Sequence, residues 1–254
     1  MSRVLMKLII CGAAGRMGQA LVAAAKALGH TVVAGVEKKG VAVAGIETTD
    51  ALKPAGADCV IDFTAPEVSL ENARTCAAAK VPIVIGTTGF STAQRAELEK
   101  LGGTAPIVVA PNMSVGVNVV IGMAAELAKR LGEDFDVEIL ETHHKRKKDA
   151  PSGTALKLAE EIASATKRTK SDFRLVREGQ IGERPEREIG VQTLRGGDVV
   201  GEHTIYFFGD GERVELSHRA TSRDQFARGA MRAAAWLQGK GPGLYDMRHV
   251  LGFL

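Results

Sequence analysis

The chain has 254 residues, of which 45% are hydrophobic and 25% charged, and its formal net charge is +3 at pH 7. These values are typical of a folded globular protein and argue against a disordered tail or a fibre. So small a net charge does not by itself indicate a nucleic-acid partner. No apolar run reaches the roughly 18 residues that a membrane span needs. We therefore expect a soluble, cytoplasmic protein with no membrane or nucleic-acid partner.

The cysteines Cys11, Cys59 and Cys76 lie in apolar segments and at no metal-ligand spacing. An odd number of cysteines suits a reducing compartment better than a disulfide framework. We interpret all of them as core residues.

The first half of the chain alternates short apolar runs with helical periodicity, which is typical of a parallel sheet wrapped by crossover helices. The strands are predicted at residues 4–11, 31–37, 59–64, 81–86 and 105–110. A helix over 19–29 ends at Gly29, and Ser91 and Gln94 have the spacing of a capping box at the start of another. The pattern predicts a Rossmann-like α/β domain.

A glycine-rich turn, GAAGRMG at residues 12–18, joins the first predicted strand to its helix. Such a turn lets backbone N–H groups and the positive end of the helix approach a pyrophosphate, although glycines also make plain tight turns. The context favours a dinucleotide, because Glu37 follows at the end of the second strand, where it can bind ribose hydroxyls. Lys38 and Lys39 come directly after it and suit the 2′-phosphate of NADP. The sequence thus has features for either NADH or NADPH.

The character of the chain changes near residue 114. A long apolar helix is predicted over 114–132, and residues 134–141 then alternate polar and apolar with period 2. A helix over 151–163 and strands over 188–195, 199–208 and 212–220 follow, with glycine turns between the last strands. We expect a second, α+β domain with a mixed or antiparallel sheet at residues 115–221. The final helix, in residues 222–254, is expected to return to the first domain.

The segment ETHHKRKKDAPSGTA, residues 141–155, combines adjacent histidines, a run of cations and a predicted helix start. Histidine exchanges protons near neutral pH, and lysine offers a compact charge and a donor. The N–H groups at the start of a helix bind anions favourably. The segment therefore predicts a site for a small polycarboxylate.

Other interpretations of this basic run remain open. It has the composition of a solvated surface loop, or of a nucleic-acid patch that lacks interleaved aromatic residues. A metal site at His143, His144 and Asp149 is disfavoured, since adjacent residues of an extended chain point to opposite faces and neighbouring cations repel a metal ion. We expect no metal.

Several motifs together resemble a known family, the dihydrodipicolinate reductases. GAAGRMG, DFTAPE, GTTGF, APNMSVGVNV, HHKRKKDAPSGTA, REGQIGER and GEHTIYF occur in the order and with roughly the spacing of that family, over nearly the whole chain. The resemblance implies reduction of the ring formed from 4-hydroxy-tetrahydrodipicolinate to tetrahydrodipicolinate by NADH or NADPH, in lysine and diaminopimelate biosynthesis. It implies that residues 1–114 and 222–254 bind the dinucleotide. Residues 115–221 would bind the dicarboxylate substrate and form a homotetramer through their sheet.

The resemblance also implies roles for individual residues. His143 resembles the family's catalytic acid/base and Lys147 its proton donor. The implied substrate-binding residues are His144, Ser152, Gly153 and Thr154. The implied cofactor-binding residues are Gly12, Ala13, Ala14, Gly15, Arg16, Met17, Glu37, Lys38, Gly86, Thr87, Thr88, Ala110, Pro111, Asn112 and Met113. Arg223 is expected to touch either ligand.

Two other functions fit parts of the pattern. A reductase of a different oxo or imino acid would keep the cofactor half and change residues 143–154. A nicotinamide sensor without catalysis would bind cofactor but would not need a proton donor beside an anion site.

Overall fold

The computed structural model describes residues 5–222 and 224–254, which form two compact units. The first unit contains the chain up to Val115 and the segment Asp224–Leu254, and the second contains the stretch between them. Arg223 lies outside the described residues. No helix of the described part is long and apolar enough to cross a membrane.

The first unit is built on a parallel sheet of seven strands, in the order β12-β6-β5-β4-β1-β2-β3. Its predicted strands are confirmed as β1 (Lys7–Cys11), β2 (Thr31–Val36), β4 (Cys59–Asp62), β5 (Ile83–Ile85) and β6 (Pro106–Val109). The sequence prediction missed the two edge strands, β3 (Thr48–Thr49) and β12 (Gly243–Tyr245). Both are too short to produce a periodic pattern, so only pairing with a neighbour defines them.

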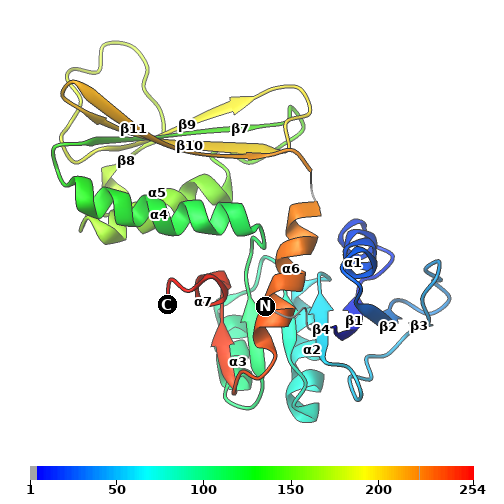
Figure 1. The fold of residues 1–254 in the computed structure, drawn as a ribbon. Helices are drawn as coiled ribbons and strands as arrows, with labels where there is room; N and C mark the ends of the chain where they lie inside the picture. The colour runs from blue at the N-terminus through cyan, green and yellow to red at the C-terminus, as the bar shows by residue number, and fades with distance from the viewer. Residues whose placement is uncertain (1–4, 223) are drawn as a thin grey trace. The chain divides into compact units, whose positions relative to one another are not determined.

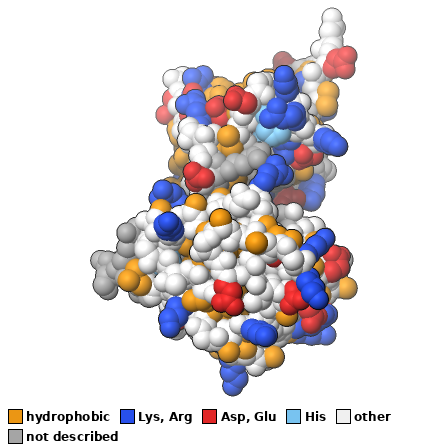
Figure 2. All heavy atoms as spheres, turned by 90° about the vertical axis from the view of Figure 1, so that its right-hand side faces the viewer, with side chains coloured by type: hydrophobic (Ala, Val, Ile, Leu, Met, Phe, Trp, Pro, Cys, Tyr) orange, Lys and Arg blue, Asp and Glu red, His pale blue; other side chains and the backbone are white. Residues whose placement is uncertain are grey.

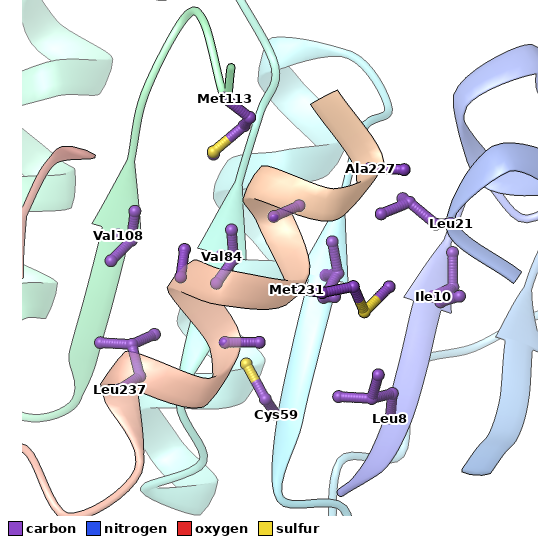
Figure 3. Packing of buried hydrophobic residues seen from close by; sticks show 14 of the residues in the cluster. Leu8, Ile10, Leu21, Cys59, Val84, Val108, Met113, Ala227, Met231 and Leu237 are labelled. Atoms are coloured by element: carbon purple, nitrogen blue, oxygen red, sulfur yellow. The ribbon is translucent and has the colours of Figure 1, made fainter. Parts of the chain in front are cut away.

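Helices cover both faces of this sheet. Along β1, Leu8 and Ile10 pack with α1 (Arg16–Ala27) and α6 (Asp224–Leu237), as Figure 3 shows. Ile9 and Cys11 pack on the other face, where α2 (Pro66–Ala79) and α3 (Thr92–Gly102) lie. Burial on both faces explains why these strands are continuous apolar runs. The cysteines are free and buried, as predicted.

The ends of several helices are set by local sequence. Ser91 Oγ accepts a hydrogen bond from the Gln94 N–H, and Gln94 Oε1 accepts one from the Ser91 N–H, which confirms the predicted capping box of α3. Gly29, with φ +80°, follows α1, and Gly132, with φ +78°, follows α4 (Val115–Leu131). A short C-terminal helix, α7 (Met247–Leu251), begins at an Asp246 cap.

The second unit is a mixed sheet of five strands, in the order β11-β10-β7-β9-β8. The strands are β7 (Asp136–His143), β8 (Phe173–Arg174), β9 (Ile189–Arg195), β10 (Gly201–Gly209) and β11 (Glu212–Ala220). β7 runs parallel to β9 and antiparallel to β10. A 3-10 turn at Lys170–Asp172 precedes β8.

One face of the second sheet is covered by α4 and α5 (Gly153–Ala165), as seen in Figure 1. Val137, Ile139 and Glu141 of β7 are buried, whereas the residues between them are partly exposed. This alternation agrees with the period-2 pattern in the sequence and shows that β7 is covered on one side. The core below it contains Val117, Ile121, Leu158, Ile162, Val191, Ile205 and Phe207.

Candidate functional site

The end of β7 carries the residues around which the candidate site of the second unit is built. Glu141 is in register with Thr193 of β9 and with His203 of β10, and His143 is in register with Arg195. Because side chains on a strand alternate, Glu141 and His143 lie on the same face as buried Ile139. Register therefore gathers these side chains at one place.

Glu141 is the centre of a hydrogen-bond network. Its side chain is 0% exposed, and its Oε2 lies 2.5 Å from Nδ1 of His143. Both of its oxygens accept hydrogen bonds from Arg195, each at 2.9 Å. Oε1 also accepts from the backbone N–H of Ser152 at 3.0 Å and from Thr193 Oγ1 at 3.1 Å. The buried carboxylate is thus fully satisfied.

These contacts determine the charge on Glu141. Burial alone would raise its pKa, but hydrogen bonds from His143, Arg195 and the Ser152 N–H lower the pKa to about 2. Glu141 is therefore an anion at neutral pH.

The His143 ring is enclosed on further sides. The ring of His203 meets it edge-on, with the centroids 5.3 Å apart. Burial, and then the neighbouring His143, lower the pKa of His203 to about 4, so His203 is neutral at pH 7. A Cβ at Gly201 would stand 2.9 Å from Nε2 of His143. The glycine therefore leaves space that any other residue would fill.

The basic loop after β7 is tied to the same network. Arg195 Nη2 donates to the backbone oxygen of Asp149 at 2.6 Å, and Lys147 forms an ion pair with Asp149 at 2.9 Å. The Lys147 hydrogen bond lowers the pKa of Asp149. The backbone N–H of His144 donates to Val199 O at 2.8 Å. Lys147 is thereby tied through Asp149 to Arg195, which also binds Glu141.

The remaining cations of this loop are exposed, as a solvated loop would require: Lys145, Arg146 and Lys148. Figure 2 shows lysine and arginine side chains around a histidine on one face of the molecule. Among the described residues, no group of histidine, cysteine, aspartate or glutamate side chains is arranged to hold a metal ion.

The start of α5 completes this part of the site. Ser152 is the N-cap residue, and its Oγ accepts from the Ala155 N–H and lies 3.2 Å from Nε2 of His203. Since its own N–H donates to Glu141, both polar groups of Ser152 have partners within the protein. Open space surrounds the position that a Cβ of Gly153 would take. Gly153 is thus better placed than Ser152 to let a ligand approach the helix start.

The glycine turn of the first unit has the close contacts that a dinucleotide-binding turn needs. Gly12 has φ +77°, and a Cβ at Gly18 would lie 2.1 Å from the Gly12 oxygen, so α1 packs directly on the turn. Glu37 Oε1 accepts a hydrogen bond of 2.5 Å from the Ala14 N–H. The structure therefore brings together the predicted pyrophosphate turn and the predicted ribose-binding carboxylate. Arg16 is exposed at the first residue of α1.

The residues after Glu37 border a separate hollow. Lys38 and Lys39 are exposed and line it together with Lys53, Thr48 and Thr49. Its volume is about 350 Å³. Its lining contains three lysines and one acidic residue, Asp50, so the surface is cationic on balance.

Some predicted cofactor-binding residues have buried side chains. Ala13 is 0% exposed, Ala110 3% and Met113 1%, and all three belong to one hydrophobic core, in which Figure 3 labels Met113. Only their backbone groups are therefore available to a ligand. Gly86 is fixed by packing as well, because a Cβ there would lie 2.2 Å from the ring of Phe63. Asn112 Oδ1 accepts from the Ser114 N–H at 2.9 Å and shapes the turn after Pro111.

A buried acidic residue under this region was missed by the sequence interpretation. Asp62, at the end of β4, is 0% exposed and accepts hydrogen bonds from Thr64, Ser69 and Asn72. Thr87 Oγ1 lies 3.2 Å from the same carboxylate. Asp62 therefore ties the turn that contains Thr87 and Thr88 to β4 and α2.

Arginines of the REGQIGER motif make ion pairs at the other end of β7. Arg177 contacts Glu138 and Glu188, and Arg184 contacts Asp136 and Glu138. They line a hollow of about 330 Å³ beside Phe208. This motif thus anchors its own segment to the sheet.

Sequence reasoning also missed Glu141, Arg195 and His203 in the second unit. One signal was present in the sequence. Glu141 follows apolar Val137 and Ile139 at two-residue intervals, so on a strand it points to the same buried face, where a charged residue is unusual. Its partners Thr193 and Arg195 are more than 50 residues away along the chain, and only strand register identifies them.

Comparison with known proteins agrees with this architecture. Residues 6–113 match the family model described as dihydrodipicolinate reductase, N-terminus, and residues 116–251 match the one described as dihydrodipicolinate reductase, C-terminus. The chain is 54% identical to 4-hydroxy-tetrahydrodipicolinate reductase of Myxococcus xanthus, with 98% of each chain covered. It is 51% identical to the enzyme of the same name from Geobacter sulfurreducens, with 97% of this chain and 98% of that protein covered.

A solved structure has the same fold. Dipicolinate-bound dihydrodipicolinate reductase from Paenisporosarcina sp. TG-14 superposes with a TM-score of 0.81 at 26% identity, covering 96% of this chain and 98% of that one. Both family models, the near-complete coverage and the shared fold therefore show that the chain belongs to the dihydrodipicolinate reductase family.

Proposed function

We propose that this protein reduces 4-hydroxy-tetrahydrodipicolinate, through its dehydrated ring, to tetrahydrodipicolinate with NADH or NADPH, in lysine and diaminopimelate biosynthesis. The observation that carries the site assignment is the Glu141–His143 contact, which adjoins both the Lys147 loop and the start of α5. Family membership supports the reaction.

The cofactor is held by the first unit in this proposal. The turn at residues 12–17 fits a pyrophosphate, because it places backbone N–H groups directly before α1. Gly18 has no side chain that would hold α1 away from the turn. Glu37 would exchange its contact with the Ala14 N–H for the ribose hydroxyls. The turns at residues 86–88 and 110–113 would hold the nicotinamide end. When bound, the dinucleotide supplies the hydride.

The substrate is held by the second unit. One carboxylate would bind the N–H groups of Gly153 and Thr154 at the positive end of α5. The cations of the 145–148 loop favour a dianion by charge, and His144 lies beside them as a further proposed contact. The related Paenisporosarcina structure is named as dipicolinate-bound, which supports a small dicarboxylate. Ser152 then acts by holding Glu141 and His203 and touches no substrate.

Proton transfer falls to two side chains. Reduction of the ring leaves an electron-rich system that needs a proton, and Lys147 is the proposed donor. His143 is the proposed acid/base group. Asp149 holds the ammonium of Lys147, and Glu141 holds the ring of His143, so both groups are positioned before substrate binds.

Cofactor preference depends on opposing charges. Glu37 favours the ribose hydroxyls of NADH, whereas Lys38, Lys39 and Lys53 attract the 2′-phosphate of NADPH. We propose that both cofactors are used. Replacing Lys38 and Lys39 by alanine is expected to lower kcat/KM for NADPH while leaving kcat/KM for NADH within about twofold.

Assembly and compartment are part of the proposal. The sheet face away from α4 and α5 carries exposed Leu194 and Phe208, and the latter stacks on Tyr206 with centroids 5.7 Å apart. We propose that this face forms a homotetramer. Free cysteines suit the cytoplasm.

The reaction is tested by initial rates of nicotinamide oxidation, with substrate made in place from pyruvate and aspartate semialdehyde by the upstream synthase. Oxidation that depends on the synthase is the expected result with either cofactor. A folded protein that binds both cofactors and oxidises neither would instead be a reductase of another oxo or imino acid, or a sensor.

The proton donor is tested with Lys147→Ala. We expect kcat to fall by about 100-fold or more, with unchanged cofactor binding, because the donor is lost. Lys148→Ala is the matched control for kcat, since it removes an exposed cation of the same loop, which acts only on substrate binding, and leaves the donor in place. His143→Gln is expected to lower kcat as well. Wild-type kcat in both Lys147→Ala and His143→Gln would refute the assigned chemistry.

A further inference from the structure

Glu141, directly or through Arg195, contacts the strand, the loop and the helix start that carry the proposed substrate site. It contacts the ring of the proposed acid/base His143, and it accepts the Ser152 N–H at the start of the proposed carboxylate-binding helix. Its partner Arg195 also bonds the Asp149 backbone in the loop that carries Lys147. A single buried carboxylate with its arginine therefore links strand, loop and helix.

We infer that Glu141 is a positioning residue for the reduction: it fixes the His143 ring with Nδ1 turned inward and so leaves Nε2 as the nitrogen that exchanges protons. Arg195 holds Glu141 in place. This inference rests on the proposed function, because it assigns to Glu141 a role through His143.

The surroundings of Nε2 support this orientation. A Cβ at Gly201 would stand 2.9 Å from Nε2, so the glycine keeps that side of the ring open. His203 meets the ring edge-on at 5.3 Å and limits its rotation. Nδ1 thus faces Glu141, whereas Nε2 faces Gly201, where the absence of a side chain leaves it room.

The charges around the ring favour the same assignment. Glu141 on β7 faces it as an anion, Arg195 on β9 compensates that anion, and neutral His203 lies on β10. Lys147, paired with Asp149, lies in the neighbouring loop. An imidazolium formed at His143 during proton exchange would be stabilised by Glu141 without movement of either group.

The test replaces Glu141 by glutamine, which keeps the shape and removes the charge. Its matched control is Glu138→Gln on the same strand, whose carboxylate bonds Arg177 and Arg184 at the other end of β7. We expect kcat to fall about 100-fold in Glu141→Gln, with KM for the nicotinamide cofactor unchanged, and to stay within about twofold of wild type in Glu138→Gln.

A spectroscopic readout separates positioning from general loss of structure. Nitrogen-15 NMR of the histidine side chains reports which ring nitrogen carries the proton, and His143→Gln identifies the signals of His143. We expect protonated Nδ1 in the wild type and a mixture of tautomers in Glu141→Gln. This readout needs no substrate. If the wild-type protein fails to reduce the proposed substrate, that result overturns the proposed function alone, and the NMR signals still test the position of the His143 ring.

Other outcomes would overturn the inference. If the wild-type protein is active, an unchanged kcat or unchanged His143 NMR signals in Glu141→Gln would overturn it. An equal loss of kcat in the control Glu138→Gln would overturn it too. If Glu141→Gln does not fold, Gly201→Ala decides. It adds a methyl group 2.9 Å from Nε2, so the His143 ring must shift from its place against Glu141, and we expect lower kcat; wild-type kcat in this variant would contradict the role of Nε2.

Discussion

At the residue scale, the site is defined by two buried titratable groups whose pKa values are both lowered, for different reasons. Desolvation and the nearby His143 lower the pKa of His203, whereas donated hydrogen bonds outweigh desolvation at Glu141. Both shifts have the same consequence for stability. Between the folded and unfolded pKa values the unfolded chain binds more protons, so stability falls as pH falls.

His203 gives the measurable pH window. Folding lowers the pKa of His203 from 6.5 to about 4. The contribution of this shift to the free energy of unfolding is therefore complete above pH 6.5 and is lost progressively as the pH approaches 4. A shift of this size corresponds to at most ~3 kcal/mol of unfolding free energy. We expect His203→Gln to flatten the dependence of urea unfolding midpoints on pH across that window. Glu141 acts in a lower window, between its ordinary 4.5 and about 2. Equal pH slopes for His203→Gln and wild type would show that His203 is not buried as a neutral ring.

At the element scale, α1 packs closely on the glycine turn of the proposed cofactor site. A Cβ at Gly18 would meet the Gly12 oxygen at 2.1 Å and the Ala13 Cα at 2.5 Å, and both are backbone atoms that cannot rotate away. The helix must therefore shift if any side chain is added.

Gly18→Ala is expected to reverse the usual preference for alanine in a helix. Alanine normally stabilises a helix interior by ~1 kcal/mol over glycine, but here we expect a loss of about 2 kcal/mol from overpacking together with weaker cofactor binding. The measurements are denaturant unfolding and titration with NADH. Lys26→Ala, at an exposed position of the same helix, should change stability by less than about 0.5 kcal/mol. A Gly18→Ala protein as stable as wild type would mean that the turn is less tightly packed.

At the scale of the whole molecule, the second unit leaves one sheet face without a helix. Arg213 lies over the rings of Tyr206 and Phe208 on that face, and Phe208 is 38% exposed. The apolar rings give the proposed tetramer a contact surface.

Phe208→Glu should separate the chains, because a charge placed in an apolar interface is costly to bury. Light scattering after gel filtration should give the mass of four 26.8 kDa chains for the wild type and a smaller mass for the variant. A wild-type monomer, or a variant that stays tetrameric, would move the interface elsewhere.

The sequence by itself determined most elements, the Rossmann-like class of the first unit and the mixed sheet of the second, because apolar periodicity and helix caps are local properties. The glycine turn, the capping box at Ser91 and the helix start at Ser152 were predictable for the same reason. The motifs over residues 12–18 and 143–154 also carried the family.

Only the tertiary structure decided which residues meet. Glu141, Arg195 and His203 are brought together by the parallel register of β7 with β9 and the antiparallel register of β7 with β10. Asp62 and Thr87 meet because β4 pairs with β5. Pairing register depends on contacts between distant segments, and a shift of one residue would turn each side chain to the opposite face. Local patterns therefore predicted the strands, while packing selected the neighbours that hold His143 in place.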